Sequence, residues 1–331
     1  MNHHHTHDHK HDHGHDHDHG HSHGFGHHHH HIPSPDGNGR AFALAIGLNL
    51  AFVIIEFMYG FIAHSTALMA DAGHNLSDVL GLVLAWGAAM LAKSAPRGRY
   101  TYGLRGSSIL AALGNGLLLM VACGAIAWEA VQRFYEPAPV MGATVSIVAG
   151  IGVLVNGFSA WLFLAGSKGD LNIRGAYLHM AADAALSLGV VISGLVIMAT
   201  GWSWIDPAVS LAIVVVIVLG TWSLLRESVQ LSMAAVPPGV DAAAVRAYLC
   251  GQPGVREVHD LHIWAMSTTE NALTAHVVMP DGYPGDAALD AITAKLREDF
   301  SIHHSTLQVE QGTTHHHCAL QGHEHDHEHA H

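Results

Sequence analysis

The chain has 331 residues, of which 50% are hydrophobic and only 12% are charged, about half the fraction of roughly 25% that is usual in soluble domains. The formal net charge of −13 argues against a nucleic-acid-binding protein, which needs a basic face. Histidine is the anomaly, because 33 are present and most lie near the two ends of the chain. An ordinary soluble enzyme is therefore not expected.

Residues 1–39 and 313–331 form two histidine-rich tails in which histidine alternates with aspartate, glutamate or glycine. They hold too few apolar residues to offset chain entropy, so we expect both to be disordered. Neutral imidazole is a common ligand of transition metals, which favours a metal-buffering role. The tail histidines that we single out are His3, His4, His5, His7, His9, His11, His13, His15, His315, His316, His317, His323 and His325.

Residues 40–232 contain few charged residues and six long apolar stretches. Each reaches the ~20 residues that a helix needs to cross a bilayer. The pattern predicts an α-helical membrane domain of six transmembrane helices. The stretches are 41–63, 68–92, 108–134, 141–165, 171–200 and 206–232.

The basic residues predict the orientation of these helices, since cytoplasmic loops carry the excess of lysine and arginine. If the N-terminus is inside, only Arg133 lies near an outer loop, and both termini are cytoplasmic. The inner positions are Arg40, Lys93, Arg97, Arg99, Arg105, Lys168, Arg174 and Arg226.

Residues 233–312 have a different character, with shorter segments and more charge. A helix is predicted at 241–250, strands at 255–266 and 271–279, a helix at 285–300 and a strand at 304–311. The order αββαβ predicts a small α+β domain with its helices on one face of the sheet.

Two copies of His-x-x-x-Asp lie inside the second and fifth apolar stretches. They are His74 with Asp78, and His179 with Asp183. The spacing of four places each histidine and aspartate on one helix face. Two such faces together would offer two imidazoles and two carboxylates, a donor set that suits tetrahedral Zn²⁺ better than Mg²⁺ or Ca²⁺. One pair alone could be a packing hydrogen bond, but the duplication favours a metal site.

Other polar residues in the apolar stretches allow two interpretations. Asn49 and Glu56 share a face of the first stretch, and Asn156 lies in the fourth. Ion passage and interhelical hydrogen bonding explain these three equally well. Asp71 lies one turn before His74, where it could guide ions or simply favour the start of the helix.

In the small domain, His259, His276 and Glu310 lie on predicted strands, where cross-strand neighbours could converge on a metal. Ordinary surface histidines are the alternative.

Five segments resemble motifs of the cation diffusion facilitator family, and within it the bacterial cobalt–zinc–cadmium resistance exporters. The resemblance covers about residues 40–312. The segments are Ser65–Asp78, Arg99–Arg105, His179–Asp183, Val258–Trp264 and His304–Glu310.

This resemblance implies a homodimeric six-helix exporter with a ferredoxin-like cytoplasmic domain, in the inner membrane of a bacterium. It implies that His74, Asp78, His179 and Asp183 bind the transported Zn²⁺, which leaves the cytosol in exchange for protons. Co²⁺ and Cd²⁺ are further implied substrates, and no organic cofactor is expected. His259, His276 and Glu310 match cytoplasmic metal-binding positions, although Gln308 stands where some members have histidine.

Two other functions remain open from the residues alone. An intramembrane metallohydrolase would use the histidine–aspartate site to activate water, although the chain lacks a separate general-acid or nucleophile motif. A metal-storage or metal-sensing membrane protein would depend on the tails instead.

Overall fold

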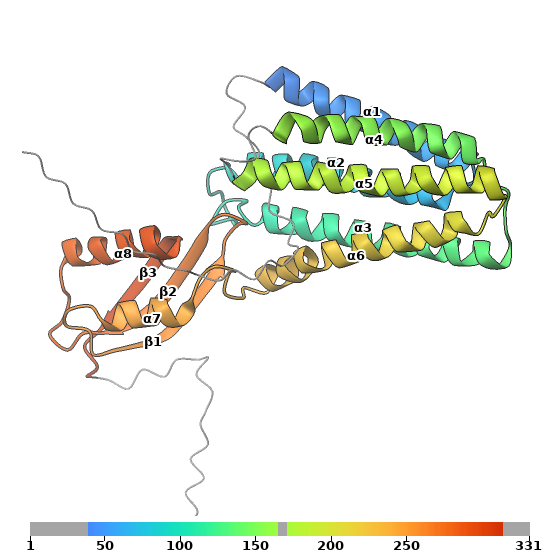
Figure 1. Cartoon of the computed structure of the whole chain (residues 1–331). Helices are drawn as coiled ribbons and strands as arrows, with labels where there is room; N and C mark the ends of the chain where they lie inside the picture. The colour runs from blue at the N-terminus through green and yellow to red at the C-terminus, as the bar shows by residue number, and fades with distance from the viewer. Residues whose placement is uncertain (1–38, 165–170, 314–331) are drawn as a thin grey trace, which may run out of the picture.

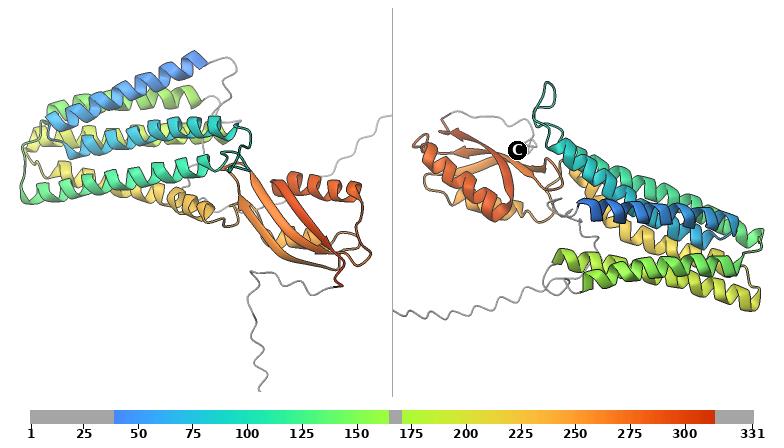
Figure 2. Two further views of the ribbon diagram at one scale, coloured as in Figure 1. Left: turned by 180° about the vertical axis from the view of Figure 1, so that it is seen from behind. Right: turned by 90° about the horizontal axis from the view of Figure 1, so that it is seen from above.

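The computed structural model describes residues 39–164 and 171–313. Both histidine-rich tails lie outside the described residues, except for Gly39 and Thr313 at their inner ends. The chain forms a bundle of six long helices with a small sheet domain attached at one end (Figures 1 and 2). The helices are α1 (Gly39–Ile62), α2 (Thr66–Ala92), α3 (Ser107–Tyr135), α4 (Gly142–Leu164), α5 (Leu171–Thr200) and α6 (Ile205–Ser232).

The six predicted apolar stretches all form helices of 23–30 residues. Within the described residues, five helices are long and apolar enough to cross a membrane. The described apolar part of α1, Leu50–Ile62, is shorter.

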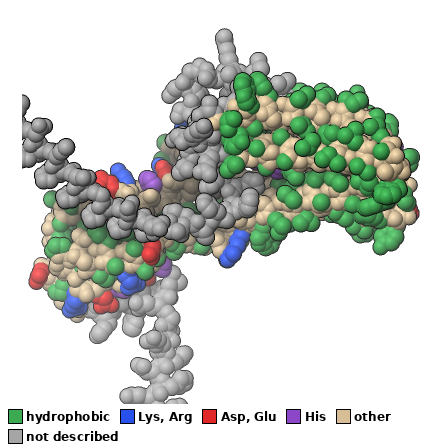
Figure 3. Space-filling model, in the orientation of Figure 1, with side chains coloured by type: hydrophobic (Ala, Val, Ile, Leu, Met, Phe, Trp, Pro, Cys, Tyr) green, Lys and Arg blue, Asp and Glu red, His purple; other side chains and the backbone are tan. Residues whose placement is uncertain are grey.

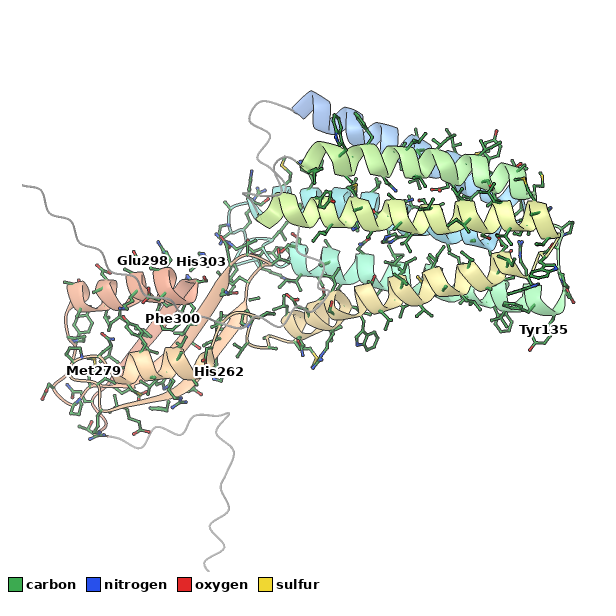
Figure 4. All side chains as sticks on the ribbon, viewed as in Figure 1. Tyr135, His262, Met279, Glu298, Phe300 and His303 are labelled. Atoms are coloured by element: carbon green, nitrogen blue, oxygen red, sulfur yellow. The ribbon has the colours of Figure 1, made fainter. Side chains whose placement is uncertain are left out.

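The surface of the bundle is apolar, as a lipid-facing surface must be. Phe61, Val121 and Leu154 are 70–72% exposed. Figure 3 shows hydrophobic side chains covering the visible face of the bundle, whereas acidic and basic side chains gather mainly on the sheet domain. Tyr135 projects at the end of the bundle remote from the sheet domain (Figure 4), where Trp202 and Trp204 are also exposed. Such an apolar surface with interfacial aromatic residues indicates a multi-pass membrane protein.

The first turn of α2, at the end of the bundle away from the sheet domain, is held by the buried carboxylate of Asp206. Ser65 caps α2, accepting a hydrogen bond from the Leu68 backbone N–H at 3.1 Å. Asp206, at the start of α6, accepts from the Thr66 backbone N–H at 2.6 Å and from the Thr66 hydroxyl at 2.9 Å. The Ser65 hydroxyl also donates to Asp206. The orphan amides at the start of α2 are thereby satisfied inside the protein.

Small residues bring α4 and α5 close together. A Cβ added at Gly194 would lie 2.7 Å from the carbonyl oxygen of Gly142, and one added at Gly142 would lie 2.6 Å from the carbonyl oxygen of Gly194. Only glycine permits this approach of two backbones. The pair formed by α4 and α5 is therefore a closely packed unit.

The sheet domain has the predicted order of elements. It contains α7 (Ala242–Cys250), β1 (Glu257–Ala265), β2 (Asn271–Val278), α8 (Asp286–Phe300) and β3 (Ile302–Glu310). The strand order is β1-β2-β3, with β1 and β2 antiparallel and β2 and β3 parallel. Both helices pack on the same core as the strands, including Leu249, Leu273, Leu296 and Ile302.

The connection between α2 and α3 and the first turn of α3 both contact the sheet domain. Arg105 forms an ion pair with Glu270, and the Ser108 hydroxyl accepts from the Thr268 backbone N–H at 3.0 Å. The domain is therefore held against the end of the bundle at which α3 begins.

Candidate functional site

The bundle brings the two His-x-x-x-Asp pairs together. His74 and Asp78 lie one turn apart on α2, and His179 and Asp183 lie one turn apart on α5. The two imidazole rings are 6.2 Å apart and nearly perpendicular. We refer to these four residues as the quartet.

The four side chains of the quartet form a closed ring of histidine–aspartate contacts. His74 Nε2 lies 3.2 Å from Asp183 Oδ1 and 3.7 Å from Asp78 Oδ2. His179 Nε2 lies 3.4 Å from Asp78 Oδ2 and 3.5 Å from Asp183 Oδ2. Zn²⁺ bound tetrahedrally at about 2.0–2.1 Å places neighbouring ligand atoms about 3.3–3.4 Å apart. Ligand atoms of His74, Asp78 and Asp183 all lie within 4.8 Å of one another, and His179 contacts both carboxylates, so the four residues are close enough to share one ion.

The exposed fraction of the quartet side chains increases toward the sheet domain. Asp183 has 2% of its side chain exposed, and the two histidines have 10% and 15%. Asp78 has 32% exposed and lies further along α2 toward the sheet domain than His74 does. Asp78 is therefore the least buried member of the quartet, and Asp183 is the most buried.

Three of the other singled-out polar residues are buried within the bundle. Glu56 of α1 accepts from the Asn75 amide at 3.3 Å, and Asp71 accepts from the Ser187 hydroxyl at 2.6 Å. Asn156 is buried in α4, and among the described residues its Nδ2 has no hydrogen-bond partner. Asn49 lies in α1, but its side chain is outside the described residues.

A second group of histidines and carboxylates lies on the sheet, which we call the sheet cluster: His259, His276 and Glu310. His276 Nδ1 lies 2.9 Å from Glu310 Oε1, and His259 Nε2 lies 3.2 Å from Glu310 Oε2. His259 and His276 are directly paired across β1 and β2. Each of the three residues offers a ligand atom within 4.8 Å of the others, so the cluster could hold a metal ion.

The sheet cluster has two neighbours that the sequence analysis did not assign to it. Asp260 has a positive φ of 50° where the register of β1 shifts, and its Oδ2 lies 3.5 Å from His276 Nε2. Gln308 donates to Glu310 at 2.8 Å. Partial burial by itself would raise the pKa of Glu310, but the Gln308 amide and the two imidazoles lower that pKa below its usual value.

Sequence reasoning missed the residues that support the quartet from a distance. Asp206, Asn75 and Ser187 are all buried and hydrogen-bonded to groups on other helices. Asp206 lies 140 positions after Thr66, so no local spacing could indicate the contact. The one feature of the sequence that could have drawn attention to Asp206 is an acidic residue at the start of an apolar stretch.

Comparison with known proteins assigns the chain to a family. Residues 42–231 match the model of the cation efflux transmembrane domain, and residues 237–312 match that of the cation efflux protein cytoplasmic domain. Zinc transporter ZitB of Escherichia coli is 36% identical over 80% of this chain and 85% of its own length. The metal cation efflux system protein CzcD of Cupriavidus metallidurans is 35% identical over 78% and 82%.

A third relative is the cadmium, cobalt and zinc/H(+)-K(+) antiporter of Bacillus subtilis, which is 33% identical over 81% of this chain and 88% of its own length. The matches to both family models and to these relatives run through the helical bundle and the sheet domain alike. The chain therefore belongs to the cation efflux family, the cation diffusion facilitators that its motifs resemble.

Proposed function

We propose that this protein is a secondary active transporter that exports Zn²⁺ from the cytoplasm in exchange for protons, with Co²⁺ and Cd²⁺ as further substrates. The observation that carries the proposal is the quartet, whose His–Asp separations of 3.2–3.7 Å suit a tetrahedral ion with two nitrogen and two oxygen ligands. The relatives named for zinc, cadmium and cobalt support the same substrate class.

The residues of the quartet explain how protons and metal compete. Imidazole must be neutral and carboxylate ionised before either binds a metal, so metal binding releases protons. High proton concentration on the outer side would then favour metal release. Both events use one set of side chains, which couples the two fluxes without a separate energy source.

The helices that hold the quartet allow it to face either side in turn. His179 and Asp183 belong to α5, which is closely packed on α4, whereas His74 and Asp78 belong to α2, which is anchored to α6 by Asp206. Rocking of one unit against the other would open the site alternately. We propose that this conformation opens toward the sheet domain, which the greater exposure of Asp78 supports.

The remaining assignments complete the proposal. The sheet domain would lie in the cytoplasm with both termini, its αββαβ order would be a ferredoxin-like arrangement, and two chains would form a homodimer in the bacterial inner membrane. The domains would span residues 1–39, 40–232, 233–312 and 313–331, with α1 as the sixth span. The sheet cluster would bind metal outside the transport path, and the tails would buffer metal.

Transport also accounts for the quartet better than hydrolysis does. A catalytic zinc site keeps a coordination position open for water, whereas two imidazoles and two carboxylates would fill the tetrahedron. We therefore propose that the chain is not an enzyme.

The proposal is tested with the purified full-length chain in liposomes. An imposed pH gradient should drive Zn²⁺ across the membrane against the direction of proton flow, and zinc movement should in turn move protons. Zinc that binds to the liposomes without crossing, at all gradients, would instead indicate a storage protein and reject the proposal.

A further inference from the structure

Two buried carboxyl groups face each other next to the quartet. Glu56 of α1 and Asp71 of α2 are both 0% exposed, and their side chains lie within hydrogen-bonding reach of each other. We refer to these two residues as the carboxyl pair. Asp71 precedes His74 by three positions on α2, and Ser187, which donates to Asp71, follows Asp183 by one turn of α5. The pair therefore lies about one turn, ~5.4 Å, from the quartet on the side away from the sheet domain.

In each group of the carboxyl pair, one oxygen accepts a hydrogen bond and the other is buried without a donor among the described residues. Glu56 Oε2 accepts from the Asn75 amide, and Asp71 Oδ2 accepts from the Ser187 hydroxyl. Among the described residues, Glu56 Oε1 and Asp71 Oδ1 are buried without a donor. A proton between the two carboxyl groups would let one donate to the other and satisfy both oxygens at once.

The surroundings of the carboxyl pair favour a retained proton. No lysine or arginine in the described part of the chain forms an ion pair with either group. The charged groups that face the pair are His74 on α2 and Asp183 on α5. The nearby part of α4 presents Gly152, where an added Cβ would lie 3.3 Å from the Ser187 hydroxyl. Two adjacent carboxylates in so dry a place repel each other, so both cannot remain ionised.

We propose that Glu56 and Asp71 form a proton-binding site separate from the quartet, which holds one proton shared by two carboxyl groups and exchanges it during the transport cycle. The O–H bond breaks when the quartet takes up a divalent cation, because the added positive charge stabilises two carboxylates nearby, and the proton passes to water. It is regained when the cation leaves. This inference rests on the proposed function for its place in the cycle, but the existence of the shared proton does not.

The first test is infrared difference spectroscopy of the full-length protein in lipid, with and without Zn²⁺. The wild type should show the C=O band of a buried carboxylic acid, and this band should weaken when Zn²⁺ binds. Glu56→Gln and Asp71→Asn should each abolish the band. Glu129→Gln, which removes a carboxyl group from α3 that pairs with Arg133, is the matched control and should keep it.

Ser187→Ala provides a second test in case Glu56→Gln or Asp71→Asn fails to fold. It removes the donor to Asp71 Oδ2 and should shift the band without abolishing it. A band that is absent from the wild type, or unchanged in Glu56→Gln and Asp71→Asn, would overturn the shared proton. The wild-type protein could also lack the band and bind zinc in a way that depends on Na⁺ or K⁺. That result would show that a cation, not a proton, lies between the two carboxyl groups, and it would also overturn the proposal.

The second test is calorimetry in buffers of different ionisation enthalpy, which counts the protons released per Zn²⁺ bound. Glu56→Gln should release fewer protons than the wild type, by up to one, while its zinc affinity falls by less than about tenfold, or 1.4 kcal/mol. An unchanged proton count would reject exchange at the pair. Failure of the wild type to move Zn²⁺ across liposomes would instead reject the proposed function and leave the infrared result standing.

Discussion

Within the described residues, the quartet and the sheet cluster have similar histidine–carboxylate contacts, but the quartet is held by helices and the sheet cluster by strands. Two histidines contact two carboxylates in the quartet, at separations of 3.2–3.7 Å, and one carboxylate in the sheet cluster, at separations of 2.9–3.2 Å. The quartet is divided between α2 and α5, two helices that belong to separately packed units. The sheet cluster is built on three hydrogen-bonded strands.

This difference separates two ways of using a metal. Ligands on neighbouring strands are held at fixed spacing by the backbone hydrogen bonds, so they suit a site that holds its ion. Ligands on two helices that can rock apart suit a site that must release its ion on the other side. We infer that similar donor sets serve transport in one region and stable binding in the other.

The largest expected effect is the loss of zinc flux on removal of a quartet ligand, compared with removal of a sheet-cluster ligand. Asp183→Ala removes a quartet ligand that is 2% exposed, and zinc flux should fall by more than about 100-fold, beyond the 10–100-fold cost of losing a supporting residue. Glu310→Ala, the matched change in the sheet cluster, should keep flux within about threefold of wild type. Flux into liposomes measures both, and correct insertion is checked by protease protection. Equal losses in the two variants would remove the distinction.

Metal selectivity sharpens the comparison further. His74→Asp changes the quartet from two imidazoles to one imidazole and three carboxylates, and carboxylates adapt more readily to a larger ion. We expect the ratio of Cd²⁺ flux to Zn²⁺ flux to rise about tenfold, or 1.4 kcal/mol. His276→Asp in the sheet cluster is the control and should leave this ratio unchanged. A constant ratio in well-folded His74→Asp protein would show that His74 does not set selectivity.

The sheet cluster should respond to pH in a way that follows from Glu310. The pKa of this group is lowered, so its ionised form stabilises the folded domain above the unfolded pKa of about 4.3. That stabilisation is lost as the pH falls through the lower, folded pKa. The melting temperature of the metal-free wild-type domain should therefore exceed that of Glu310→Gln at neutral pH, and the difference should shrink in acid. A difference that grows in acid would contradict this assignment.

Deletion of the N-terminal tail should have the smallest effect. Without residues 1–31 the quartet and its helices are unchanged, so zinc flux should stay within about twofold of wild type, while the metal bound per chain should fall. Equilibrium dialysis counts the bound metal. Loss of flux in a correctly folded deletion would show that the tail takes part in transport.

Much of this fold can be predicted because its patterns are local. Long apolar stretches predict the helices of the bundle, and the alternation around His259 and His276 predicts β1 and β2. The two His-x-x-x-Asp pairs could likewise be found from spacing alone. Their convergence depends on the packing of α2 near α5, which the duplication of the motif indicated but no local pattern determines.

The residues that support the site could not be predicted, because their contacts join distant parts of the chain. Asp206 meets Thr66, and Ser187 meets Asp71 116 positions away. The sequence alone does not decide between packing and ion passage for Glu56, or between ion guidance and helix initiation for Asp71, since these choices depend on contacts between helices. Asp260 was missed at the sheet cluster because its orientation depends on the bulge in β1.

X-ray absorption spectroscopy of the zinc-loaded protein tests the quartet most directly. The chain would lack residues 1–31 and 314–331 and carry His259→Ala, His276→Ala and Glu310→Ala, so that the quartet is the remaining cluster. One equivalent of Zn²⁺ should show four nitrogen or oxygen ligands at about 2.0–2.1 Å, two of them imidazoles, and Asp183→Ala should abolish this signal. Six-coordinate zinc, or the same spectrum in Asp183→Ala, would contradict a tetrahedral site shared between α2 and α5.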